Sequence, residues 1–169
     1  NMLGYNGSFG GLGVSLAYVN GGASAAGGGA SDSSWVITYD GLMDGLSVGV
    51  GMGENGTTQD LSTVWIKYTA GSITAGFQKS EVDNTGSTAD EDATAVAVSI
   101  AVNENLSISA GKHDVDMGAG KVDEESTGVS ASYTVGSSTI GFVANSTDNV
   151  AGTAGTDDSY RELSVSFAF

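Results

Sequence analysis

The end of the chain alternates strictly between apolar residues and small or polar ones. The apolar set consists of Leu163, Val165, Phe167 and Phe169, and the residues between are Glu162, Ser164, Ser166 and Ala168. A period of two is typical of a β-strand whose faces meet different surroundings. A soluble sheet that ended on such a strand would expose an apolar edge. A membrane β-barrel has no such edge, because its last strand pairs with its first.

The same alternation recurs along the whole chain and predicts eleven strands. They cover residues 1–9, 12–18, 33–39, 46–52, 64–68, 73–77, 96–102, 106–110, 129–135, 140–144 and 159–169. Short turns alternate with long connections, and two of the long ones, 81–92 and 114–125, are rich in acidic residues. Outer-membrane barrels have this asymmetry, with short periplasmic turns and long external loops. We therefore predict an all-β, antiparallel, up-and-down transmembrane barrel.

The two faces of the predicted strands differ in composition. Aromatic residues lie near strand ends on the apolar face, as in the interfacial girdles of membrane barrels; they include Phe9, Tyr18, Trp35, Tyr39, Tyr68, Phe77, Tyr133 and Phe167. The opposite face is mostly Ser, Thr and Gly, which are too small to fill a narrow barrel. This face predicts the wall of a wide, wet lumen or the solvent side of a sheet.

The final strand resembles the C-terminal strand of bacterial outer-membrane porins. In that family Leu163, Val165, Phe167 and Phe169 would form the signal that the barrel-assembly machinery reads. Arg161 departs from the pattern, but it lies at the outer end of the strand, where a charge costs about 0–1 kcal/mol. Residues 1–18 resemble the hairpin that follows the constriction loop in sixteen-stranded trimeric porins of α-proteobacteria.

The resemblance implies a single barrel domain over residues 1–169, corresponding to the C-terminal two-thirds of a porin. It also implies a homotrimer in contact with lipid and lipopolysaccharide in the bacterial outer membrane. The first and last predicted strands run in the same direction and cannot pair antiparallel, so we expect an incomplete barrel of eleven strands out of sixteen. The first five strands and the constriction loop would then be absent.

Composition excludes several other classes of protein. Mean hydropathy of +0.02 resembles that of a soluble protein, but lipid-facing and lumen-facing residues cancel in a barrel. No segment approaches the roughly 20 apolar residues of a membrane helix. The net charge of −15 argues against nucleic-acid binding, and the absence of Cys excludes disulfides and thiolate sites. No signal peptide is visible at residues 1–5, so it has been removed or the chain begins partway through a longer protein.

Few side chains on the lumen-facing positions could influence solute passage. The pore-lining candidates are Lys67, Gln78, Ser99, His113 and Glu162. Charges among them would bias ion passage where the pore narrows, and would otherwise be solvated on a wide wall. Trp65 shares the face of Lys67 and is large for this wall, so we predict either a local bulge or a contact with a plug.

Neither catalysis nor a regular metal site is predicted. His113 is accompanied by many Ser residues, but no Gly-x-Ser-x-Gly segment is present, and we predict no enzymatic activity. The segment 114–125 begins like a calcium loop, although Gly118 and Ala119 break the EF-hand pattern. No cofactor is expected; loose calcium binding by external loops and plain solvated loops both remain open, the candidate ligands being Asp114, Asp116, Asp123 and Glu125.

The sequence thus predicts a general-diffusion porin for small hydrophilic solutes, with cations favoured by the negative charge at its mouth. One alternative is a secreted or surface all-β binding module, calcium-dependent or not, which would purify without detergent. Another is the translocating barrel of a larger secreted protein, which would carry a helix through its lumen.

Overall fold

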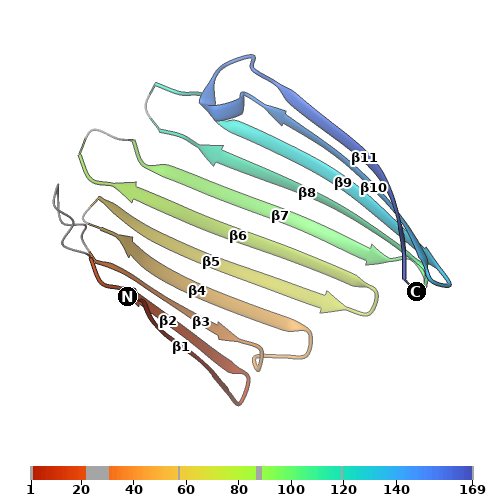
Figure 1. The fold of residues 1–169 in the computed structure, drawn as a ribbon, viewed down its shortest axis with the longest axis horizontal. Helices are drawn as coiled ribbons and strands as arrows, with labels where there is room; N and C mark the ends of the chain where they lie inside the picture. The colour runs from red at the N-terminus through yellow and green to blue at the C-terminus, as the bar shows by residue number, and fades with distance from the viewer. Residues whose placement is uncertain (1, 22–30, 57, 87–88, 119, 169) are drawn as a thin grey trace.

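The computed structural model describes residues 2–21, 31–56, 58–86, 89–118 and 120–168. Over this part of the chain, one antiparallel sheet contains eleven strands in sequential order (Figure 1). The strands are β1 Met2–Phe9, β2 Leu12–Val19, β3 Asp32–Tyr39, β4 Leu46–Asn55, β5 Gln59–Ala70, β6 Ile73–Asn84, β7 Glu91–Ala101, β8 Leu106–Asp116, β9 Glu124–Val135, β10 Ser138–Asp148 and β11 Asp158–Phe167. The predicted fold class and strand count are confirmed.

The two ends of the sheet differ in their connections, as the sequence predicts. Figure 1 shows the tight hairpins at one end of the curved sheet and the longer connections at the other. Gly71 and Gly136, in the turns after β5 and β9, have φ of +58° and +59°. This left-handed conformation closes a two-residue turn with a twist that matches the strands, and glycine adopts it without strain.

The strands extend further toward the long connections than predicted. Residues 81–84, 91–92, 114–116 and 124–125 were expected in loops, but they belong to β6, β7, β8 and β9. The prediction was wrong because it followed hydrophobic alternation, which ends where the apolar face becomes charged. Backbone pairing does not depend on that alternation, so the ladder continues.

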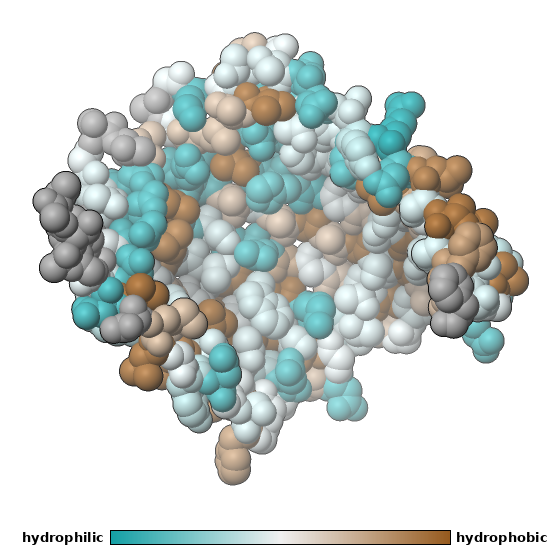
Figure 2. All heavy atoms as spheres, in the orientation of Figure 1, coloured by the Kyte–Doolittle hydropathy of each residue, from teal (hydrophilic) through white to brown (hydrophobic). Residues whose placement is uncertain are grey.

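The sheet has no hydrophobic core within the described residues. Gly49 and Gly51 are the only buried residues among them, and most of the large apolar side chains are exposed on one face of the sheet. Val96 is 46% exposed, Phe142 41% and Leu163 72%. In the view of Figure 2, pale and teal residues cover much of the middle of the molecule, with brown residues between them and at the rims. We call the two sides of the sheet the apolar face and the polar face.

The sheet is open. β1 pairs only with β2 and β11 only with β10 among the described residues, and both edge strands run toward the tight hairpins. The predicted mismatch between the first and last strands is therefore confirmed. One 3₁₀ turn, η1 (Val150–Gly152), lies in the connection between β10 and β11. The described residues contain no helix long and apolar enough to cross a membrane.

Candidate functional site: a trough on the polar face

Direct pairing between neighbouring strands arranges the polar face in rows that cross the sheet, and three neighbouring rows are described below. The tryptophan row contains Thr38, Gly49, Trp65, Gln78, Ala95, His113, Ser126 and Thr147. The lysine row contains Ser47, Lys67, Gly76, Ala97, Gly111, Gly128 and Asn145. The hydroxyl row contains Thr69, Thr74, Ser99, Ser109, Ser130, Val143 and Glu162.

The lysine row forms the floor of a trough, because its middle members have little or no side chain. A hollow of about 260 Å³ lies at the β5–β7 end, lined by Trp65, Lys67, Gly76, Gln78, Ala95 and Ala97. A second hollow, of about 500 Å³, continues from the same two alanines across β8, β9 and β10; its lining includes Gly111, His113, Gly128 and Asn145. Sequence reasoning missed the trough, since only the register shows that these small residues lie side by side.

Trp65 is held against its neighbouring strand by a glycine. Gly49 lies directly opposite on β4, and a Cβ placed on it would be 2.4 Å from both Cε2 and Nε1 of the indole. Such a distance is far below a van der Waals contact, so only glycine accommodates this position of the ring. The ladder on both sides of Trp65 is continuous, so the predicted bulge is wrong.

Lys67 is the cation of the trough. It follows Trp65 by two residues on β5 and lies opposite Ser47 and Gly76. None of the described carboxylates comes within 4.0 Å of its ammonium group, whereas Lys79 and Lys112 each have two carboxylate partners. The charge of Lys67 is thus available to a solute in the trough.

Gln78 and two serines beside the trough, Ser109 and Ser130, are held by hydrogen bonds. The Gln78 amide lies opposite Trp65 and donates to Thr63 Oγ1 at 3.3 Å and to Ser80 Oγ at 3.0 Å. Ser99 lies opposite Ser109 in the hydroxyl row, and the Ser109 and Ser130 hydroxyls are 2.7 Å apart. Because these networks fix the side chains, the wall presents a defined surface.

The structure brings some of the predicted pore-lining residues together and separates others. Lys67 and Gln78 line the same hollow on β5 and β6, and Ser99 belongs to the adjacent hydroxyl row on β7. His113 lies further along the tryptophan row, on β8. Glu162 is on β11, where it accepts a hydrogen bond from the Tyr160 hydroxyl. The predicted set is therefore distributed over much of the wall.

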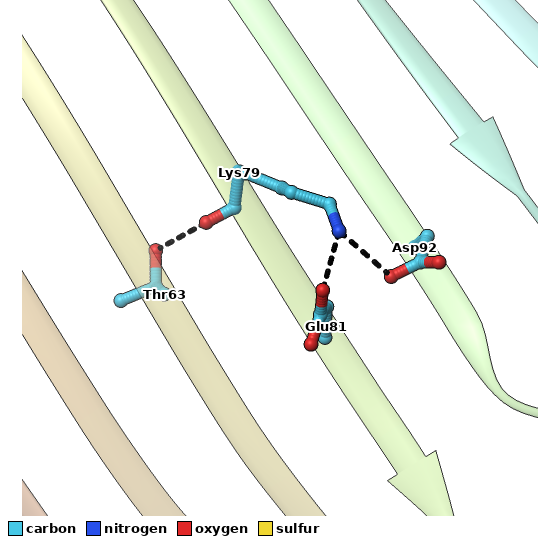
Figure 3. Close-up of polar contacts among 4 residues, drawn as sticks. All are labelled: Thr63, Lys79, Glu81 and Asp92. Carbon is cyan, nitrogen blue, oxygen red and sulfur yellow. Dashed lines mark hydrogen bonds and ion pairs between the residues drawn. The ribbon is translucent and has the colours of Figure 1, made fainter.

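A charged belt on the apolar face was not predicted. Lys79 points toward Glu81 and Asp92, as Figure 3 shows, with 3.8 Å between Nζ and Asp92 Oδ1. The arrangement repeats two strands further on, where Lys112 Nζ is 3.0 Å from an Asp114 oxygen and 2.7 Å from a Glu125 oxygen. In each unit the lysine precedes an acid by two residues and meets a second acid across the ladder. The spacing of two residues can be read in the sequence, but the contact with the second acid depends on the register of the neighbouring strand.

The candidate metal ligands occupy this belt and the connection beside it. Asp114 and Asp116 lie on β8, Glu125 lies opposite Asp114 on β9, and Asp123 precedes β9. Asp116 accepts a hydrogen bond from the Gly118 N–H at 2.8 Å. The described residues contain no group of three or more His, Cys, Asp or Glu side chains placed to hold a metal ion. Calcium binding stays a prediction.

The apolar residues of the final strand are open to the surroundings. Leu163 is 72% exposed, Val165 54% and Phe167 64%. Phe169, the fourth member of the predicted assembly signal, lies outside the described residues. The three described members share one face of an edge strand, where a binding partner could reach both their side chains and the unpaired backbone.

The sequence matches a family model described as Gram-negative porin over residues 1–169. No curated protein matches it significantly. The fold is similar to an anion-selective porin from Comamonas acidovorans, with 14% identity and a TM-score of 0.81 over 100% of this chain. It is also similar to Pseudomonas aeruginosa OccK3, with 15% identity and a TM-score of 0.77 over 99% of this chain. A triple mutant of the Rhodopseudomonas blastica porin is similar as well, with 15% identity and a TM-score of 0.71 over 99% of this chain. The chain spans 59%, 58% and 55% of those three chains, respectively.

Proposed function

This chain belongs to the Gram-negative porin family, and we propose that it is the C-terminal part of a general-diffusion porin. The family consists of outer-membrane channels rather than enzymes. The proposed activity is passive: small hydrophilic solutes and ions cross a water-filled lumen and are selected by size and charge. The observation that carries the proposal is the contrast between the faces, one exposing large aliphatic and aromatic side chains and the other bearing a wide wall of Ser, Thr and Gly.

The whole protein would contain a second part that completes the barrel. Two edge strands that run in the same direction can be joined into a closed antiparallel barrel only by an odd number of further strands. Five more strands would give the sixteen of the porins that the sequence resembles. The compared chains are longer than this one, which covers 55–59% of their length, so they contain further residues that such strands and their connections would need.

The proposed surroundings follow from the apolar face. Its aliphatic band would contact lipid, and the charged belt above it would lie at the level of lipopolysaccharide head groups. Three copies would assemble into a homotrimer. The exposed apolar residues of β11 would be recognised by the barrel-assembly machinery before the strand is paired.

Ion preference would be set by the acids that face the lumen or its entrance. Much of the acidic charge lies on the apolar face instead, in residues such as Asp60, Asp83 and Asp92. The acids on the polar face lie mainly toward the long connections; they are Asp32, Glu91, Glu124, Asp158 and Glu162. A negative field at that end favours cation entry. The anion selectivity named for the Comamonas porin is a property of that protein.

Channel formation can be tested with the full-length protein extracted in detergent and reconstituted in planar bilayers. We expect stepwise ohmic conductance in KCl and a reversal potential that shifts toward cation preference as salt is lowered, since screening weakens. Conductance with an unchanged reversal potential would contradict the cation preference only. A protein that purifies without detergent and forms no channel would contradict the porin function and favour a secreted binding module.

A further inference from the structure

We propose that the hollow at Trp65 and Lys67 binds a small carboxylate carried on a flat ring, such as an aromatic carboxylate, as it passes through the channel. This inference rests on the proposed channel function and adds a solute class to it. It comes from three features of the hollow that occur together: a fixed aromatic surface, a cation that has no carboxylate partner among the described residues, and a floor of glycine and alanine.

The aromatic surface is fixed before any solute arrives. The indole of Trp65 is packed against the backbone of β4 at Gly49, where any larger residue would displace it. Gly49 and its neighbour Gly51 are the only buried residues in the described part of the chain, so this is the most closely packed region of an otherwise thin wall. A ring held in place stacks a second ring at a lower entropic cost than a free one.

The cation lies beside the indole on the same face of the same strand. Trp65 and Lys67 are two residues apart on one face of β5, which places their Cα atoms roughly 6–7 Å apart along the strand. The flexible lysine side chain can bring its ammonium to the edge of a ring stacked on the indole. Because none of the described carboxylates neutralises Lys67, a bound carboxylate would make the ion pair that the protein leaves open.

The floor leaves room for the ring. Gly76 lies opposite Lys67, and Ala95 and Ala97 continue the floor on β7. A Cβ added at Gly76 would meet only the Ile66 carbonyl oxygen, at 3.7 Å, so a larger residue fits there without strain. The hollow is therefore open because glycine occupies position 76, where the backbone would also accept a larger residue. Gln78 borders the hollow; its amide nitrogen donates to Thr63 and Ser80, which leaves its carbonyl oxygen to accept a hydrogen bond from a hydroxyl on the solute.

The site can be tested by solute block of single channels of the full-length protein in planar bilayers. The probe is benzoate; acetate carries the charge without the ring, and benzyl alcohol carries the ring without the charge. We expect benzoate to interrupt the KCl current at concentrations at which acetate and benzyl alcohol do not. Lys67→Gln, Trp65→Ala and Gly76→Val should each raise the half-blocking concentration at least tenfold.

Two variants serve as controls. Trp65→Phe keeps a ring and should stay within about threefold of the parent protein, whereas Lys121→Gln removes a charge from the connection after β8 and should change nothing. Equal block by benzoate and acetate, or full benzoate block in Gly76→Val, would overturn the site while leaving the channel intact.

A measurement of benzoate binding to the protein in detergent distinguishes an incorrect site proposal from an incorrect channel proposal. If the protein does not conduct, saturation-transfer NMR can still report contact between benzoate and the solubilised protein. Contact that disappears in Gly76→Val would support the site and contradict the channel. Absence of contact in the parent protein would overturn the site.

Discussion

The indole of Trp65 occupies the space that a side chain at position 49 would need, because Gly49 lies directly opposite it and an added Cβ would be 2.4 Å from Cε2. The two residues are therefore matched as a pair. The effect of a substitution at position 49 on stability should therefore depend on which residue occupies position 65. This coupling can be measured.

We expect Gly49→Ala to destabilise the barrel by roughly 1–3 kcal/mol, because the indole must leave its rotamer or the strands must separate. In a Trp65→Ala background the same substitution should cost much less, since the obstructing ring is gone. Urea titration in detergent micelles would measure both values. Gly76→Ala is the matched control, and its change should stay within about 0.5 kcal/mol because its Cβ is unobstructed. Equal costs of Gly49→Ala in both backgrounds would contradict the pairing.

The belt on the apolar face contains acids that oppose one another directly. Asp60 lies opposite Glu54 on β4 and opposite Asp83 on β6. Like charges in facing positions destabilise a sheet, so Asp60→Asn should raise the free energy of unfolding by roughly 0.2–1 kcal/mol for each pair relieved. The gain should shrink as KCl is raised, because salt screens the repulsion in the parent protein. A gain that does not depend on salt would point to another cause.

The two lysines of the belt should behave alike. Lys79→Gln leaves Glu81 and Asp92 facing each other without a cation, and Lys112→Gln does the same for Asp114 and Glu125. Both variants should melt at a lower temperature than the parent protein in low salt, with the difference reduced in high salt. Thermal melts followed by circular dichroism would show this. Lys121→Gln, which removes the same charge from the connection between β8 and β9, should have the same melting temperature as the parent protein.

The face assignment of the final strand predicts opposite outcomes for adjacent residues. Leu163→Arg would place a charge on the apolar face halfway along β11, at a cost of about 2–4 kcal/mol near the middle of a bilayer. Ser164→Arg places the same charge on the polar face, where water can solvate it. We expect the first variant to lose most of its folded protein in outer-membrane preparations and the second to keep it. Similar losses in both would contradict the assignment.

The sequence was sufficient to predict the eleven strands and the face on which their apolar side chains lie. Alternation is a local property, so the series Leu163, Val165 and Phe167 indicates its own strand and its own face without knowledge of a partner. The direction of each strand follows from its place in the order of strands. The strand count alone therefore predicted that the first and last strands run in the same direction and cannot pair antiparallel. The acids beyond Phe77 and Val96 were misassigned to loops because acids replace the apolar residues on the apolar face there, which ends the hydrophobic alternation.

The trough required information that no single segment contains. That Gly76, Ala97, Gly111 and Gly128 form one floor depends on the register of three strand pairs, and a shift of one residue would move a floor residue to the other face. The position of Trp65 depends on the absence of a side chain on a different strand. Sequence reasoning identified the residue as unusual, but it could not identify Gly49 as the reason that the ring fits.

The extension of β6 past its apolar segment affects the shape of the entrance. From Phe77 to Asp83 the strand rises about 20 Å at roughly 3.3 Å per residue, and it is hydrogen-bonded on both sides over nearly all of that distance. The upper wall is therefore hydrogen-bonded sheet at a level where loops were predicted. A solute would be sized by a rigid vestibule before it reaches the plane of the bilayer, and shortening the loop tips above it should leave the size limit unchanged.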